Sequence, residues 1–80
     1  MQAITKNPAF EISEARAIEV LFSGFRKCDR NRNNRCVVMF GDEPIIVTAE
    51  LSLNDGEFIV TAYDEAGRFV ASARCDQHDR

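Results

Sequence analysis

The sequence lacks the short motifs that mark an enzyme or a cofactor-binding protein. It contains no G-x-S-x-G nucleophile motif, no glycine-rich phosphate loop and no paired-carboxylate motif. Its one histidine, His78, is near the C-terminus, where holding an imidazole rigidly beside a nucleophile is difficult. We therefore expect a protein that is not an enzyme and that binds no cofactor.

Long apolar runs and a leader sequence are also missing. No run reaches the about 18 apolar residues that a membrane-spanning helix needs. Residues 1–8 lack a basic stretch followed by an apolar one, which argues against a secretory signal. The three cysteines are an odd number, which suits a secreted disulfide framework poorly. These features predict a cytoplasmic protein with reduced thiols.

The cysteines and the histidine do not form a clear metal-binding motif. Cys28, Cys36, Cys75 and His78 are the candidate ligands, with Cys75-x-x-His78 as the tighter half. However, the spacing from Cys28 to Cys36 is not that of a zinc knuckle. Because cysteine also serves as a small buried apolar side chain, we expect no bound metal.

What the chain does contain is enough apolar sequence for one small domain over residues 1–80. Of its 80 residues, 45% are hydrophobic, as in globular proteins. A chain this short buries only about 60% of the surface that it exposes when unfolded, so its core needs nearly all its apolar residues or a partner. The formal net charge of −3 argues against non-specific binding to nucleic acids or membranes.

Residues 14–27 show the periodicity of one amphipathic helix. Ser13 suits the N-cap position, and Glu14 places a negative charge at the positive end of the helix dipole. Gly24 lowers helix propensity by roughly 1 kcal/mol relative to alanine, which indicates either a close approach or an early end. The apolar stripe at three- and four-residue spacing consists of Ala15, Ile18, Leu21, Phe22 and Phe25.

Residues 35–75 show the alternation of a four-stranded antiparallel meander. Three turn signals interrupt it, namely Gly-Asp-Glu-Pro at 41–44, Asn-Asp-Gly at 54–56 and Asp-Glu-Ala-Gly at 64–67. With the helix packed across one face of this sheet, the chain predicts an α+β fold.

The remaining segments connect or extend these elements. A basic, asparagine-rich loop over residues 28–35 joins the helix to the sheet, and residues 76–80 form a short tail. Residues 3–5 are a candidate for a short additional edge strand.

The turns also predict which strand residues pair. A two-residue Asp-Gly turn pairs Leu53 with Phe58, and an even loop at the first turn pairs Phe40 with Ile45. An even loop at the third turn has the same parity, so all three turns agree on which residues face inward. The predicted inner face consists of Cys36, Val38, Phe40, Ile45, Val47, Ala49, Leu51, Leu53, Phe58, Val60, Ala62, Phe69, Ala71 and Ala73.

The opposite face carries more apolar side chains than a solvated sheet needs. In the predicted register Met39 lies beside Ile46, and Tyr63 lies beside both Thr48 and Val70. Exposed apolar clusters on small proteins mark interfaces, although cover by the N-terminal segment is an alternative. The predicted partner-binding residues are Val37, Met39, Ile46, Tyr63 and Val70.

Charges of opposite sign are separated along the chain. Between Gly41 and Ala66 there are seven acidic and no basic residues, which turn chemistry explains in part and which otherwise suits a basic partner. Around the predicted loop, five basic residues stand against Asp29 alone. They suit either a solvated loop or contact with nucleic-acid phosphates, without interleaved aromatics for base stacking. The five are Arg26, Lys27, Arg30, Arg32 and Arg35.

In its size, mild acidity and lack of catalytic motifs, the chain resembles small phage-encoded inhibitors, the anti-CRISPR proteins among them. The resemblance covers the whole chain but rests on no motif, so it assigns no residue a role. It implies a protein partner, namely a nucleic-acid-handling complex whose basic surface an acidic protein could block. We therefore expect a non-catalytic protein-binding module, with a homodimer as one form. The alternative is a small nucleic-acid-binding or regulatory protein that uses residues 26–35.

Overall fold

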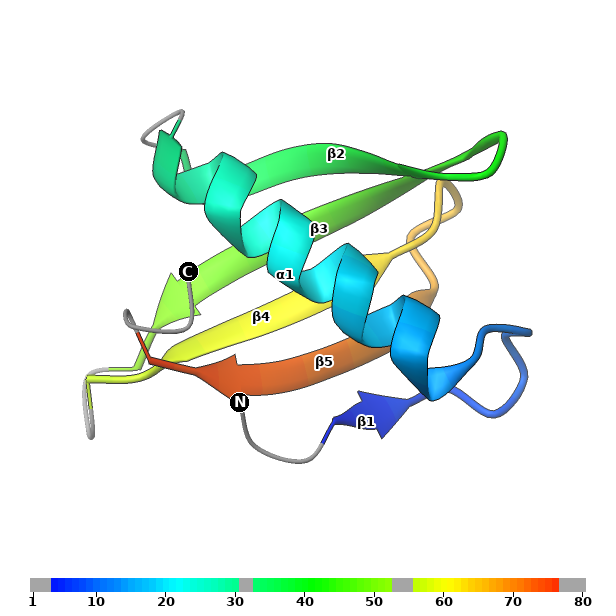
Figure 1. Ribbon diagram of the computed structural model, residues 1–80, viewed down its shortest axis with the longest axis horizontal. Helices are drawn as coiled ribbons and strands as arrows, with labels where there is room; N and C mark the ends of the chain where they lie inside the picture. The colour runs from blue at the N-terminus through cyan, green and yellow to red at the C-terminus, as the bar shows by residue number, and fades with distance from the viewer. Residues whose placement is uncertain (1–3, 31–32, 53–55, 77–80) are drawn as a thin grey trace.

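One α-helix lies across one face of a five-stranded antiparallel sheet in the computed structural model, which describes residues 4–30, 33–52 and 56–76 (Figure 1). The sheet order is β1-β5-β4-β3-β2, so β1 and β2 form its two edges. This confirms the predicted α+β fold, with one short additional edge strand. The elements are β1 (Thr5–Lys6), α1 (Glu14–Arg30), β2 (Arg35–Phe40), β3 (Glu43–Leu51), β4 (Phe58–Tyr63) and β5 (Phe69–Cys75).

Helix α1 begins as predicted but ends later. The Ser13 Oγ accepts a hydrogen bond from the Arg16 N–H at 3.2 Å, which is an N-cap. At the other end, Cys28 is buried and its carbonyl accepts from the Asn33 N–H at 3.0 Å, so helix α1 continues to Arg30 rather than ending at residue 27. Residues 28–30 of the predicted basic loop therefore belong to α1, and Arg35 belongs to β2.

The buried stripe of α1 is turned relative to the predicted one. Ala17 and Gly24 are buried and face the sheet, whereas Ala15 is exposed and Ile18 is half-buried. A Cβ atom on Gly24 would lie 2.5 Å from the Val47 Cβ, so the helix approaches the sheet closely there. Small side chains permit this approach, and the apolar periodicity alone did not identify them.

The sheet residues that face α1 form the other half of a single core. Alternation along β2, β3 and β4 sends every second side chain toward the helix, as predicted. The buried apolar residues are Ile12, Ala17, Val20, Leu21, Phe25, Cys28, Cys36, Val38, Ile45, Val47, Ala49, Val60, Ala62, Val70, Ala71, Ala73 and Cys75.

The first two hairpins keep the predicted faces but shift the predicted pairs by two residues. In β2 and β3 Phe40 pairs with Glu43, not with Ile45, because the turn is only two residues long and starts at Gly41, whose φ is 62°. An even shift leaves each side chain on its predicted face.

In the second hairpin, Leu51 rather than Leu53 pairs with Phe58. The Ser52 N–H donates to the Glu57 carbonyl at 2.7 Å, so the loop closes earlier than a two-residue Asp-Gly turn would close it. Leu51 consequently lies at the end of β3 and is 55% exposed, although it was predicted to be in the core. Leu53 lies outside the described residues.

The third hairpin contains a β-bulge, and the predicted position of Val70 is wrong. Ala62 pairs with Ala71 but Tyr63 pairs with Phe69, which leaves Val70 as the extra residue. Val70 is 0% exposed and belongs to the core, not to the outer face. The odd shift also removes Phe69 from its predicted inner position, because it now pairs with an outer-face residue.

Candidate functional site

The face of the sheet away from α1 carries one continuous apolar row. Val37 pairs with Ile46, and Ile46 pairs with Tyr63, so the row crosses β2, β3 and β4. Val37 and Met39 are 48% and 59% exposed, and Ile46 and Tyr63 are half-buried. The structure thus brings together four of the five predicted residues, and we call Val37, Met39, Ile46 and Tyr63 the outer patch.

Phe69 adjoins the outer patch, and Ile59 lies farther along β4 on the same face, beyond Thr61. Ile59 is 38% exposed on the outer face of β4, and Phe69 is half-buried beside Tyr63. Alternation along the strand already placed Ile59 on this face. Phe69 was missed because nothing near it in the sequence marks the bulge.

A shallow hollow of about 270 Å³ lies at one end of the outer patch. Its apolar part is formed by Ile46 and Tyr63, with Arg35 and Glu65 supplying charges of opposite sign. A hollow of this composition can accept an apolar side chain that carries a polar end. Its main lining residues are Arg35, Ile46, Thr48, Tyr63, Asp64 and Glu65.

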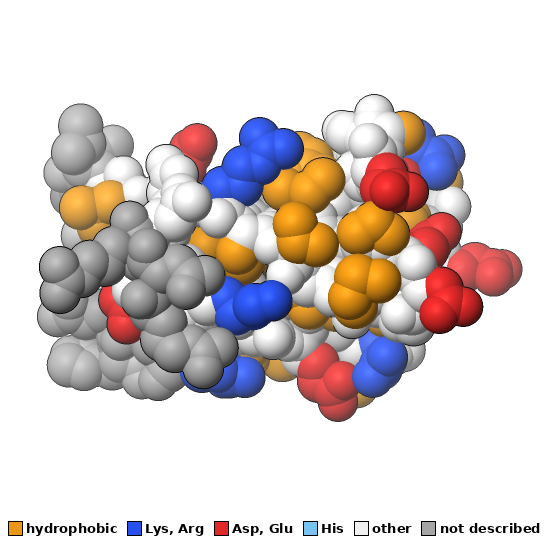
Figure 2. All heavy atoms as spheres, turned by 90° about the horizontal axis from the view of Figure 1, so that it is seen from above, with side chains coloured by type: hydrophobic (Ala, Val, Ile, Leu, Met, Phe, Trp, Pro, Cys, Tyr) orange, Lys and Arg blue, Asp and Glu red, His pale blue; other side chains and the backbone are white. Residues whose placement is uncertain are grey.

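The outer patch is continuous with the open edge of β2. Figure 2 looks onto this edge and shows hydrophobic side chains gathered over it, basic side chains beside them, and acidic side chains at the end where β2 turns into β3. From the helix, the Lys27 Nζ donates to the Val37 carbonyl at 2.7 Å. That carbonyl therefore points away from β3.

The predicted basic residues do not form a single loop. Arg26 and Lys27 lie on α1, where the Arg26 guanidinium is 6.0 Å from the centre of the Phe22 ring. Arg35 is an exposed β2 residue that lines the hollow. Arg30 ends the helix, and Arg32 lies outside the described residues. The structure therefore separates the predicted phosphate-binding set over a helix and a strand.

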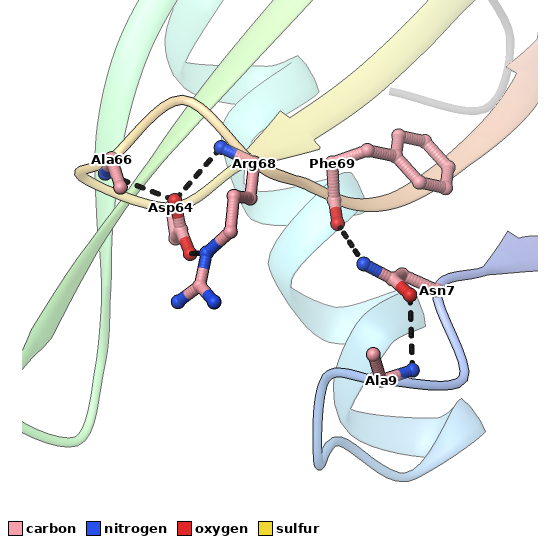
Figure 3. A network of polar contacts seen from close by, with 6 residues as sticks. All are labelled: Asn7, Ala9, Asp64, Ala66, Arg68 and Phe69. Atoms are coloured by element: carbon pink, nitrogen blue, oxygen red, sulfur yellow. Dashed lines mark hydrogen bonds and ion pairs between the residues drawn. The ribbon is translucent and has the colours of Figure 1, made fainter.

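The β4–β5 turn beside the hollow is organised by Asp64 (Figure 3). One carboxylate oxygen accepts from the N–H groups of Ala66 and Arg68, both at 2.9 Å. The other accepts from the Arg68 Nε at 2.8 Å. The Arg68 N–H is the main cause that lowers the pKa of Asp64 below its ordinary value; burial opposes the shift, and the guanidinium and the Ala66 N–H add to it.

Asn7 holds the bulge that follows this turn (Figure 3). Its backbone N–H donates to the Val70 carbonyl at 2.9 Å, and its side-chain amide donates to the Phe69 carbonyl at 2.8 Å. Its side-chain oxygen accepts from the Ala9 N–H at 2.9 Å. A bulge leaves backbone groups without ladder partners, and Asn7 provides partners for two of them.

We expect the Asp64→Asn variant to lose stability at neutral pH and to show a weaker dependence of stability on acid. Asparagine keeps an oxygen that can accept the two turn N–H groups but loses the ion pair with Arg68. Because the folded pKa of Asp64 is lowered, its contribution is complete above about pH 4 and disappears as the pH falls through the folded pKa.

Thermal unfolding between about pH 2 and pH 7 measures this difference, which should be largest at the neutral end. The matched control is Asp42→Asn, the same change in the exposed β2–β3 turn. An equal loss of stability for Asp64→Asn at both ends of the pH range would contradict the assigned role of the charge.

Two of the three thiols, those of Cys28 and Cys36, form a buried pair. The Sγ atoms of Cys28 and Cys36 are 3.5 Å apart, and the Cys36 thiol donates to the Gly24 carbonyl at 3.2 Å. Cys75 lies on β5, separated from β2 by two strands. Within residues 4–30, 33–52 and 56–76, no cluster of three potential ligands could hold a metal ion. His78, the fourth candidate ligand, lies outside those ranges.

No family model, curated protein or solved structure matches the chain. The resemblance to phage-encoded inhibitors therefore stays a prediction. In the part of the chain that the structure describes, no helix has the length and apolar character to cross a membrane.

Proposed function

We propose that this chain is a non-catalytic protein-binding module that binds its partner through the outer patch. The observation that carries the proposal is the exposure of Val37 and Met39, 48% and 59%, in one apolar row with Ile46 and Tyr63. Exposed apolar surface of this kind is costly in water unless a partner covers it. The hollow beside Tyr63 supplies a position for one anchoring side chain.

The partner that suits this surface is a protein with a basic contact area. Asp42 and Glu43 are exposed at one end of the outer patch, and Glu65 is exposed beside the hollow. Carboxylates around an apolar centre orient a basic partner and speed its association. A nucleic-acid-handling complex has such basic surfaces, so inhibition of one, as in the anti-CRISPR type, is the activity that we propose.

We expect Tyr63→Ala and Met39→Glu each to weaken partner binding by at least about tenfold, because each removes apolar contact area from the proposed surface. The matched control is Leu51→Glu. Leu51 is as exposed as Met39 but lies outside the outer patch. Affinity capture from the native host with quantitative mass spectrometry identifies the partner, and titration with the purified partner measures the affinity.

Equal capture by the wild type and both patch variants would overturn the outer patch as the binding surface. The nucleic-acid alternative is tested on the same proteins by a salt titration with duplex and single-stranded DNA. Binding with a steep salt dependence that is lost on neutralising Arg26, Lys27 and Arg35 would favour that alternative. We expect no binding to either DNA at low salt.

A further inference from the structure

The open edge of β2 presents a defined row of backbone groups. The Asn34 carbonyl accepts from the Ala49 N–H of β3 at 2.9 Å, whereas the Val37 carbonyl accepts from the Lys27 Nζ at 2.7 Å. Backbone groups along an antiparallel edge strand alternate between partner and solvent. The N–H and C=O groups of Arg35, Val37 and Met39 therefore point away from the sheet.

The helix supplies a second layer beside this edge. The Gly24 carbonyl lies 3.2 Å from the Cys36 Sγ, and Ser23 lines a groove with Val38 and Met39, so this part of α1 is level with Val37. Glu19 and Lys27 are each four residues from Ser23, about one helical turn on either side of this level. Glu19 lines the groove beside Val38 and Met39, whereas Cys28, the residue after Lys27, contacts Cys36. Glu19 and the backbone of Lys27 thus lie on opposite sides of the level of Val37.

We propose that a second copy of this chain pairs antiparallel with β2 across a twofold axis at Val37. Val37 would then face Val37 of the second copy, and Arg35 would face Met39. Because the three outward residues of each copy carry both a donor and an acceptor, this register forms a regular ladder. The result is a ten-stranded sheet, twice the five strands of one copy, with both helices on the same face.

The charges along the edge favour a second copy over an unrelated extended segment. One end of β2 carries the exposed Arg35, and the other end leads to the exposed Asp42 and Glu43. A twofold axis at the apolar centre brings the basic end of one copy to the acidic end of the other. Isologous interfaces require this kind of self-complementarity.

The same axis assigns a new partner to Lys27. In the single chain its ammonium group satisfies the Val37 carbonyl, which in the dimer accepts the Val37 N–H of the second copy instead. Since Glu19 and Lys27 lie one helical turn on either side of the axis, Lys27 then faces Glu19 of the second copy. Glu19 is also bonded to Arg16 at 2.9 Å in its own chain, so the carboxylate is already oriented on this side of the helix.

Sedimentation equilibrium of the full chain over a concentration series tests the proposal. We expect Val37→Pro to weaken dimerisation by roughly thirtyfold, because the variant removes the donors of both central hydrogen bonds. The hydrogen bonds between β2 and β3 within each copy should persist, since the Val37 N–H points to the open edge. Val37→Ala is the matched control, because it shortens the side chain but keeps the N–H, and circular dichroism verifies the fold of both variants.

A charge exchange tests the register without any backbone change. Glu19→Lys alone and Lys27→Glu alone each place like charges opposite one another and should weaken dimerisation. The double variant carrying both changes restores opposite charges at both symmetric positions, and we expect it to recover most of the lost affinity. Failure of the double variant to recover, with both single variants weakened, would overturn the proposed register.

The edge and the outer patch share Val37 and Met39, but the dimer uses the backbone groups of these residues and the outer patch uses their side chains, so this inference goes beyond the proposed function. Met39→Glu should weaken partner binding but preserve the dimer, since it places a carboxylate opposite Arg35 of the second copy. Glu19→Lys, which lies on α1 outside the outer patch, should weaken the dimer and leave partner binding unchanged. A wild-type chain that stays monomeric up to about 1 mM would overturn the dimer but leave the outer patch standing. A dimer that survives Val37→Pro unchanged would also overturn it.

Discussion

Replacing Gly24 with alanine is expected to destabilise the protein by about 2 kcal/mol, although the same change in an exposed helix would stabilise it by about 1 kcal/mol. A Cβ at this position would lie 2.5 Å from the Cβ and Cγ1 of Val47 and 2.6 Å from its Cγ2. Because Val47 is fully buried and its Cβ cannot rotate away, α1 or β3 has to move. Urea unfolding followed by circular dichroism measures the change.

Ser23→Ala is the matched control for Gly24→Ala. Ser23 is the preceding residue of the same helix but is only half-buried, so the change should leave stability within about 0.5 kcal/mol of the wild type. A Gly24→Ala protein as stable as the wild type would mean that the helix does not approach β3 as closely as the structure shows.

Truncating Phe25 to alanine is expected to have the largest effect of all, a loss of about 3–5 kcal/mol. Phe25 is fully buried, and its ring centre lies 5.1 Å from that of Phe58 on β4. The loss includes the burial of a large side chain, an aromatic contact and the cavity left behind. For a small domain this approaches the whole free energy of unfolding.

Phe25→Ala is expected to leave much of the protein unfolded. Phe25→Leu is the milder variant whose stability can be measured, and we expect it to lower the free energy of unfolding by about 1–2 kcal/mol. Phe22→Ala is the matched control, since Phe22 is only half-buried and packs near Arg26 at the margin of the helix. Equal losses for Phe22→Ala and Phe25→Ala in urea unfolding would contradict the orientation of α1.

The orientation of α1 shows what periodicity can and cannot predict. Spacing of large apolar residues identified the helix, its N-cap at Ser13 and two of its buried residues, Leu21 and Phe25. It did not identify Ala17 and Gly24 as sheet-facing, because small residues contribute little apolar area and their role depends on what lies opposite. Gly24 was recognised as unusual, but the sequence could not tell a close approach from an early helix end.

For the strand pairs, too, the sequence predicted one property, the face of each residue, but not another, its partner on the next strand. Alternation defines only the face on which a residue lies, and this face stays the same when the pairing of a hairpin shifts by two residues. The two-residue first turn and the longer second loop therefore moved Phe40 and Leu51 to new partners without exchanging the faces. The bulge is different because a one-residue shift does exchange them.

For the candidate site, the sequence predicted most of the outer patch but not its surroundings. Val37, Met39, Ile46 and Tyr63 follow from alternation within single strands. The error at Val70 arose because the bulge is held by Asn7, which is far away in the chain, and no local signal marks it. The hollow and the groove beside β2 combine residues from several elements and exist only after these elements have packed.

The sequence by itself determined the α+β class, the helix start and the two faces of β2, β3 and β4, because these depend on local periodicity and capping. Only the tertiary structure decided the pairing register, the burial of Val70 and the position of β2 at an open edge. Those features depend on which distant groups satisfy the backbone: Asn7 at the bulge and Lys27 at the Val37 carbonyl. Local propensity contains no information on such long-range partners.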